Sequence, residues 1–225
     1  NSGRAPCHLR LTPVGYNFPA MNPTLRGTLY LIPTPIGDVS DVSDISEQVR
    51  DIVRTLDGVI AESKKAALAF LRGMNYPKQL NEVPVRLLNE HTRPSELDGL
   101  LEPLRRGERW GILSDAGCPA VADPGADLVR LAHEQGIRVS ARVGPSAILL
   151  ALMASGLNGQ RFEFHGYLSR DPAVRRRELS AMEKDTMRNG RTHIWMETPY
   201  RNPALLDDIL SSLKPSTDLS IAVDL

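Results

Sequence analysis

The chain has few of the residues and runs that mark several common protein classes. Its 225 residues include only two cysteines, Cys7 and Cys118, which are far apart and show no metal-type spacing. A disulfide framework is therefore not expected, no metal site is predicted, and a reducing, cytoplasmic compartment is favoured. The longest apolar run, Ala147 to Ala154, is too short to cross a bilayer, so no membrane partner is expected.

An excess of charge of either sign is also missing. The chain carries 27 basic and 27 acidic residues, so it has no overall electrostatic attraction to nucleic acid. Basic residues do gather locally in the second half, at Arg170, Arg175, Arg176, Arg177, Arg188 and Arg191. An RNA backbone could use such a cluster. A solvated face of a charged helix, predicted over Arg175 to Lys184, is the interpretation that we favour.

Several familiar catalytic motifs do not occur. The sequence has no G-x-G-x-x-G, no P-loop, no G-x-S-x-G and no H-E-x-x-H. These absences leave dinucleotide binding, nucleoside triphosphate hydrolysis and nucleophilic hydrolase chemistry poorly supported.

Short apolar runs alternate with segments of helical spacing. The runs predict buried strands at Thr28–Ile32, Gly58–Ala61, Pro84–Leu88, Trp110–Leu113 and Ile137–Val143. Strands that alternate with helices favour an α/β fold with a mainly parallel sheet.

A break at Gly156–Gly159 suggests two domains. We expect a tail or extension over residues 1–26, an N-terminal α/β domain over 27–156 and a C-terminal α/β domain over 157–225. The helix predicted from Ala147 to Ser155 is so uniformly apolar that it is expected to be buried nearly all round. The second domain, which ends on a strand predicted from Asp218 to Val223, is expected to be incomplete at its end.

Three loops rich in small residues follow predicted strands, at Pro33–Gly37, Ser114–Gly125 and Gly144–Ser146. Ligands of open α/β sheets bind at the carboxyl ends of the strands, so these loops are candidate binding loops. The longest of them carries two carboxylates. Asp115 is expected to contact a ligand, whereas Asp123, followed by Pro124, is expected to cap a helix.

These motifs, in this order, resemble the tetrapyrrole methylase superfamily and most closely its ribosomal RNA branch. The resemblance covers residues 27–225. It is carried by Thr34–Gly37, Ser114–Pro119, Ala122–Gly125, Gly144–Ala147, Ala154–Leu157 and Glu197–Arg201.

The resemblance implies two α/β domains with a cofactor cleft between them, a homodimer, and S-adenosylmethionine as the cofactor. Matched position by position, it implies that the cofactor is contacted by Pro35, Gly37, Asp115, Gly117, Cys118, Gly144, Pro145, Ser146, Ala147, Met196 and Glu197.

The chain departs from the ribosomal RNA branch at positions expected to face the acceptor. A-E-D-T-R is replaced by Ala61–Lys65, which keeps only Glu62 of the charged cluster. H-[DE]-H-N is replaced by Asn89–Thr92, which keeps one histidine, and Tyr200 takes the place of a histidine before Arg201. The pattern is that of a divergent paralogue with a retained cofactor and an uncertain acceptor.

A methyl transfer to a ribose hydroxyl needs a group that accepts a proton, and Glu62 and His91 are the candidates. The predicted function is methylation of ribosomal RNA from S-adenosylmethionine, at a ribose 2′ oxygen. Two alternatives stay open. One is a methyltransferase acting on a small molecule or another acceptor, and the other is a catalytically silent, dimeric binding protein.

Overall fold

A computed structural model describes residues 27–225, so the predicted tail, residues 1–26, lies outside the described residues. Contacts divide the chain into two compact units, one ending at Pro145 and the other running from Ser146 to Leu225. This division precedes the predicted boundary at residue 156, and it assigns the helix that follows Pro145 to the second unit. The domain limits stay a prediction.

The first unit is built on a five-stranded sheet in which every neighbouring pair is parallel. The strand order is β3-β2-β4-β1-β5. The strands are β1 (Thr28–Ile32), β2 (Gly58–Ala61), β3 (Val85–Leu87), β4 (Arg109–Leu113) and β5 (Arg138–Ala141). The predicted parallel α/β architecture of this unit is confirmed.

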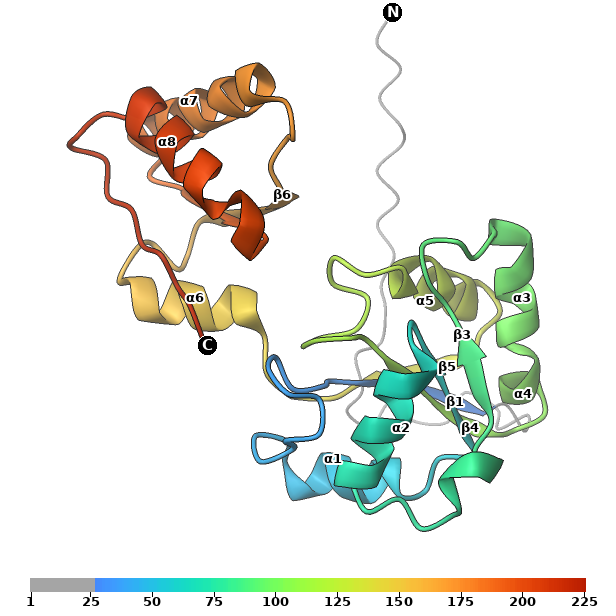
Figure 1. Ribbon diagram of the computed structural model, residues 1–225. Coiled ribbons are helices and arrows are strands. Elements are labelled where there is room, and N and C mark those ends of the chain that lie inside the picture. Colours follow the sequence, from blue (N-terminus) through green and yellow to red (C-terminus); the bar gives the residue numbers. More distant parts are fainter. Residues whose placement is uncertain (1–26) are drawn as a thin grey trace, which may run out of the picture. The chain divides into compact units, whose positions relative to one another are not determined.

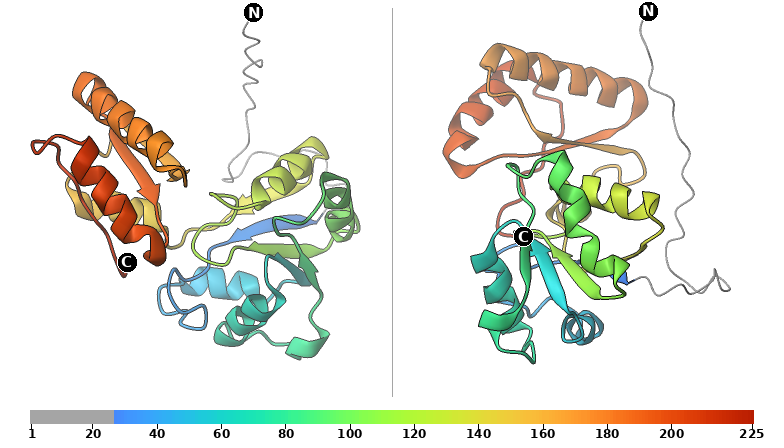
Figure 2. Two further views of the ribbon diagram at one scale, coloured as in Figure 1. Left: turned by 45° about the horizontal axis from the view of Figure 1, so that its top comes forward. Right: turned by 90° about the vertical axis from the view of Figure 1, so that its right-hand side faces the viewer.

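Helices cover both faces of this sheet (Figures 1 and 2). One face packs on α1 (Glu47–Val53) and α2 (Lys64–Gly73), with Phe70 and Leu71 fully buried. The other face packs on α3, α4 and α5. These elements span Leu97–Leu100, Glu102–Arg105 and Gly125–Glu134, and the short 3₁₀ turns η1 and η2 span Leu80–Glu82 and Pro94–Glu96.

The second unit contains a parallel pair of strands and three helices. The elements are α6 (Ala147–Ser155), β6 (Phe162–Tyr167), α7 (Pro172–Asn189), β7 (Thr192–Met196), the 3₁₀ turn η3 (Pro199–Arg201) and α8 (Asn202–Ser212). Leu168, Leu179, Leu205 and Ile209 form its core.

Two expectations for this unit are wrong. In α6 only Leu152 is buried, whereas Met153 is 78% exposed, because the described residues cover the helix on one side only. Residues 218–223 form no strand, although Ile221 and Val223 keep the alternation of one. A strand needs a hydrogen-bonded neighbour, and the described sheet of this unit ends at β6 and β7.

No helix within residues 27–225 combines the length and apolar character that a bilayer crossing requires.

Candidate functional site

The carboxyl ends of the parallel strands bring the predicted binding loops of the first unit to one edge of the sheet. Pro35 and Gly37 follow β1, Glu62 follows β2, the loop Ser114–Gly125 follows β4 and Gly144 follows β5. Because β4, β1 and β5 are neighbours in the sheet, the three small-residue loops are neighbours too. We refer to this set of loops as the carboxyl edge.

The loops after β1 and β4 are bonded to each other. Thr34 and Gly117 form a two-way backbone bridge, with N–O distances of 2.9 and 3.1 Å. The Thr34 hydroxyl, which is buried, also donates to the carbonyl of Ser114 at 3.1 Å. Thr34 begins the sequence motif Thr34–Gly37, but its bonding role is not visible in the sequence because the bond joins residues 80 positions apart.

Two glycines allow the loop after β5 to approach the loops after β1 and β4 closely. A Cβ on Gly144 would lie 2.1 Å from Cγ of Pro33, so only glycine fits there. Gly117 has φ +75°, a left-handed conformation that favours glycine, and a Cβ there would lie 3.5 Å from the carbonyl oxygen of Pro145. Gly37 differs, because nothing lies within 4 Å of the position its Cβ would take.

Cys118 holds the loops after β4 and β5 together. Its thiol donates to the carbonyl of Pro145, with an Sγ–O distance of 3.3 Å. Burial raises the pKa of this thiol, so the reactive thiolate is disfavoured. The contact indicates a packing role for Cys118 and no nucleophilic one.

Asp123 shapes the turn that leads into α5. Its Oδ1 accepts the amides of Ala120 at 3.0 Å and Gly125 at 2.6 Å. The helix starts at Gly125 and its N-cap is Pro124, one residue after the predicted cap. Burial raises the pKa of Asp123, and its two amide bonds act in the opposite direction.

Glu62 lies beside these acidic groups at the end of β2. Burial is the first cause that raises its pKa, followed by the negative charges of Asp123 and Asp115, whereas a hydrogen bond from the Asp115 amide opposes the rise. Asp115 itself is exposed. A carboxylate with a raised pKa in such a place suits proton transfer.

His91 lies on the turn after β3 and is open to solvent. Its side chain is 85% exposed and its Nε2 is 3.7 Å from the carboxylate of Glu90, which is equally exposed. No described contact joins His91 to Glu62, so its catalytic role stays a prediction.

Four of the predicted cofactor residues belong to the second unit. Ser146 caps α6, with its hydroxyl 3.5 Å from the amide of Leu149, and Ala147 is the first residue of that helix. Met196 ends β7. The next residue, Glu197, is nearly buried and pairs with Arg201 at 3.0 Å, so its carboxylate already has an internal partner.

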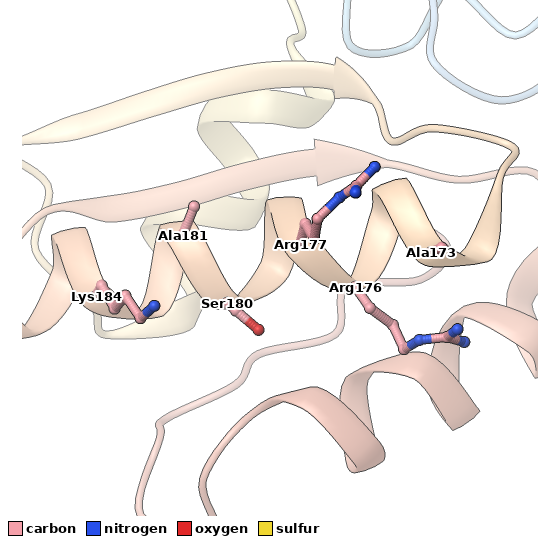
Figure 3. A pocket seen from close by; sticks show the side chains of 6 residues that line it. All are labelled: Ala173, Arg176, Arg177, Ser180, Ala181 and Lys184. Carbon is pink, nitrogen blue, oxygen red and sulfur yellow. The ribbon is translucent and has the colours of Figure 1, made fainter.

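The basic segment of α7 is only partly available to a ligand. Arg175 is buried and paired with Asp208, which corrects the expectation of a solvated face at that position. A long-range partner, 33 residues away in sequence, explains the burial. An open groove on α7 is lined by Ala173, Arg176, Arg177, Ser180, Ala181 and Lys184 (Figure 3). Arg176 pairs with Asp208 at 2.8 Å, so Arg177 and Lys184 are the cations there without a described ion pair.

Comparison with known proteins assigns the family. The family model described as Tetrapyrrole (Corrin/Porphyrin) Methylases matches residues 28–224. The chain belongs to this family. The match spans every loop of the carboxyl edge and nearly all of the second unit.

Curated tetrapyrrole methylase relatives share about a third of the aligned residues. Ribosomal RNA small subunit methyltransferase I of Escherichia coli O157:H7 is 33% identical over 89% of this chain and 66% of its own length. The proteins of the same name from Xylella fastidiosa and Bacillus subtilis are 34% and 33% identical, over 81% and 78% of this chain and 63% and 56% of their own lengths. The chain thus spans roughly two thirds or less of these three relatives.

Proposed function

We propose that the protein is an S-adenosylmethionine-dependent methyltransferase whose acceptor is small-subunit ribosomal RNA. The observation that carries the proposal is the carboxyl edge, where three small-residue loops are hydrogen-bonded to one another and one of them brings Asp115 and Asp123 near Glu62. Family membership and the names of the relatives support the activity and the acceptor.

The charges of the carboxyl edge suit this cofactor. S-adenosylmethionine carries a positively charged sulfonium and an ammonium group, and carboxylates attract both. Asp115 is exposed, and Gly37 leaves open space in the loop after β1. When bound, the cofactor supplies the methyl group. We assign Asp115 to its amine or ribose hydroxyls, and Pro35, Gly37, Gly117, Gly144 and Pro145 to the walls of its site.

Glu62 is the residue that we assign to the proton of the acceptor. A ribose 2′ hydroxyl becomes a nucleophile as it loses its proton, and a carboxylate whose pKa is raised is a better proton acceptor than an ordinary one. We place His91 near this reaction as a secondary contact, and Ser146, Ala147, Met196 and Glu197 stay cofactor contacts that the family resemblance predicts. Arg177 and Lys184 would contact RNA phosphates, and the functional form would be a homodimer.

The experiment is methyl transfer from labelled S-adenosylmethionine to ribosomal RNA from cells that lack the protein. We expect label in small-subunit RNA, at a site that resists alkaline hydrolysis because its 2′ oxygen is methylated. Asp115→Ala should lower the labelling at limiting cofactor at least tenfold, whereas Asp51→Ala, an exposed change on α1, should not lower it. Label in a small molecule, with RNA unlabelled, would show that the acceptor is not RNA. No label in any acceptor would favour a catalytically silent binding protein.

A further inference from the structure

Two histidines and a glutamate of the second unit converge on one face of its strands. Glu163 and His165 alternate along β6, so their side chains lie on the same face, and His193 of β7 is the register partner of Glu163. Nε2 of His165 is 2.8 Å from Nδ1 of His193. One potential ligand atom from each of the three residues lies within 4.8 Å of the other two.

The carboxylate of Asp185 lies next to the ring nitrogen of His193 that faces away from His165. Oδ2 of Asp185, on α7, lies 3.1 Å from Nε2 of His193, at ion-pair distance though outside hydrogen-bonding geometry. Histidines that bind metals commonly present their other ring nitrogen to a carboxylate, which fixes the ring and makes the ligand nitrogen more basic. Asp185 thus leaves Nδ1 of His193 directed toward His165 and Glu163.

Both histidines are withdrawn from solvent, and burial disfavours the protonated form of His165. The side chain of His193 is only 6% exposed. Burial lowers the pKa of His165, and the positive charge of Arg191 acts in the same direction, while Glu163 and Glu178 oppose it. A neutral imidazole is the form that binds a metal.

Arg191 is the group that competes for the carboxylates. It pairs with Oε2 of Glu163 and lies 3.4 Å from Asp185. The Glu163 side chain is 45% exposed, so it can turn toward the histidines with either oxygen. A bound dication would replace the guanidinium as the partner of this carboxylate.

We propose that Glu163, His165 and His193 bind one divalent transition-metal ion of the zinc class, which ties β6 to β7. Two imidazole nitrogens and a carboxylate oxygen suit zinc in tetrahedral coordination, with water in the fourth position. Magnesium and calcium are disfavoured because they select oxygen ligands. Bonds of about 2.1 Å set tetrahedral ligand atoms roughly 3.4 Å apart, so the two histidine nitrogens need to separate by only about half an ångström.

The test is titration of the whole chain with Zn²⁺ by calorimetry, together with the absorption spectrum of the Co²⁺ complex. We expect one ion per chain, at micromolar affinity or tighter, and the visible spectrum of tetrahedral cobalt. His165→Ala should weaken binding at least 100-fold. Asp185→Asn should weaken it by about 10- to 100-fold, through the orientation of His193.

Two other histidines of the described chain are the matched controls. His91→Ala and His133→Ala remove a histidine from the first unit and should leave Zn²⁺ binding unchanged. If His165→Ala fails to fold, Glu163→Gln, at an exposed side chain, takes its place and should weaken binding at least tenfold.

Three results would overturn the site. If the wild-type protein binds Zn²⁺ only at millimolar concentration, the site holds an adventitious ion only. Equal affinity in wild type and the His165 variant would place the ion elsewhere. A sulfur-to-cobalt charge-transfer band would assign it to a cysteine.

Discussion

Glu62 and Asp123 at the carboxyl edge of the first unit differ in pKa from Asp208 of the second unit, a residue of α8 that pairs with α7. Glu62 and Asp123 have pKa values raised by burial, and no described residue forms an ion pair with either. Asp208 is more deeply buried than either, yet hydrogen bonds from Arg176 and Arg175 outweigh its desolvation and lower its pKa. The difference separates acidic groups that form no described ion pair from one that closes an internal ion pair.

The same contrast predicts opposite pH dependences. A raised pKa in the folded state means that the stability contribution of Glu62 is full below its unfolded pKa and is lost as pH rises through the folded value. A lowered pKa means that the contribution of Asp208 is present above its unfolded pKa and is lost as pH falls through the folded value. Substitutions at the two positions should therefore separate activity from stability.

The largest effect is expected from Glu62→Gln. Removing the proton acceptor should slow methyl transfer by about 10²- to 10⁴-fold. The melting temperature should stay level or rise, with the gain over wild type growing as pH increases, because the variant has no charge to bury. Transfer assays and thermal unfolding at several pH values measure both. Glu82→Gln, at an exposed carboxylate of η1, is the control, and an E62Q protein as active as this control would contradict the assignment.

Asp208→Asn should give the next largest effect, on stability alone. The change leaves the buried guanidinium of Arg175 without its charged partner, which costs about 3 kcal/mol of unfolding free energy. Urea unfolding at neutral pH measures the loss, which should shrink as the pH falls through the folded pKa of Asp208. Its neighbour Asp207, which is exposed, provides the control Asp207→Asn. Equal stability of the two variants would show that the pair contributes little.

Two glycines of the carboxyl edge sharpen the distinction between folding and binding. Gly144→Ala should cost about 1–3 kcal/mol, because the added Cβ overlaps Pro33. Gly37→Ala meets no neighbouring atom and should change stability by less than about 0.5 kcal/mol, while weakening S-adenosylmethionine binding. Thermal unfolding and calorimetry distinguish the two. Full affinity in the Gly37 variant would remove that residue from the site.

The smallest effect is expected from Cys118→Ser. A hydroxyl can donate to the Pro145 carbonyl as the thiol does, so stability should change by about 1 kcal/mol or less. The transfer rate should stay within twofold of wild type, as measured in the same assay. A loss as large as that of E62Q would instead make the sulfur part of the chemistry.

The sequence predicts the carboxyl edge well because its information is local. Each loop directly follows an apolar run. Gly117 and Gly144 lie in short motifs, at positions where the backbone favours glycine. The parallel sheet then places those loops side by side, which the alternation of strands and helices already implies.

Features that depend on distant partners were missed. The pairing of Arg175 with Asp208 and the approach of His165 to His193 link separate elements, so no periodicity reveals them. The same limit explains α6, whose apolar composition predicts burial on all sides although the described residues bury only Leu152. Residues 218–223 keep a strand-like alternation, but a strand forms only beside a hydrogen-bonded neighbour.

Calorimetric titration with S-adenosylmethionine of wild type, Asp115→Ala and Asp51→Ala tests the central claim most directly. We predict saturable binding to wild type and to the Asp51 variant, and affinity at least tenfold weaker in the Asp115 variant, whose exposed side chain leaves folding unaffected. Equal binding by all three proteins, or no binding by a folded wild type, would contradict the assignment of the carboxyl edge as the cofactor site.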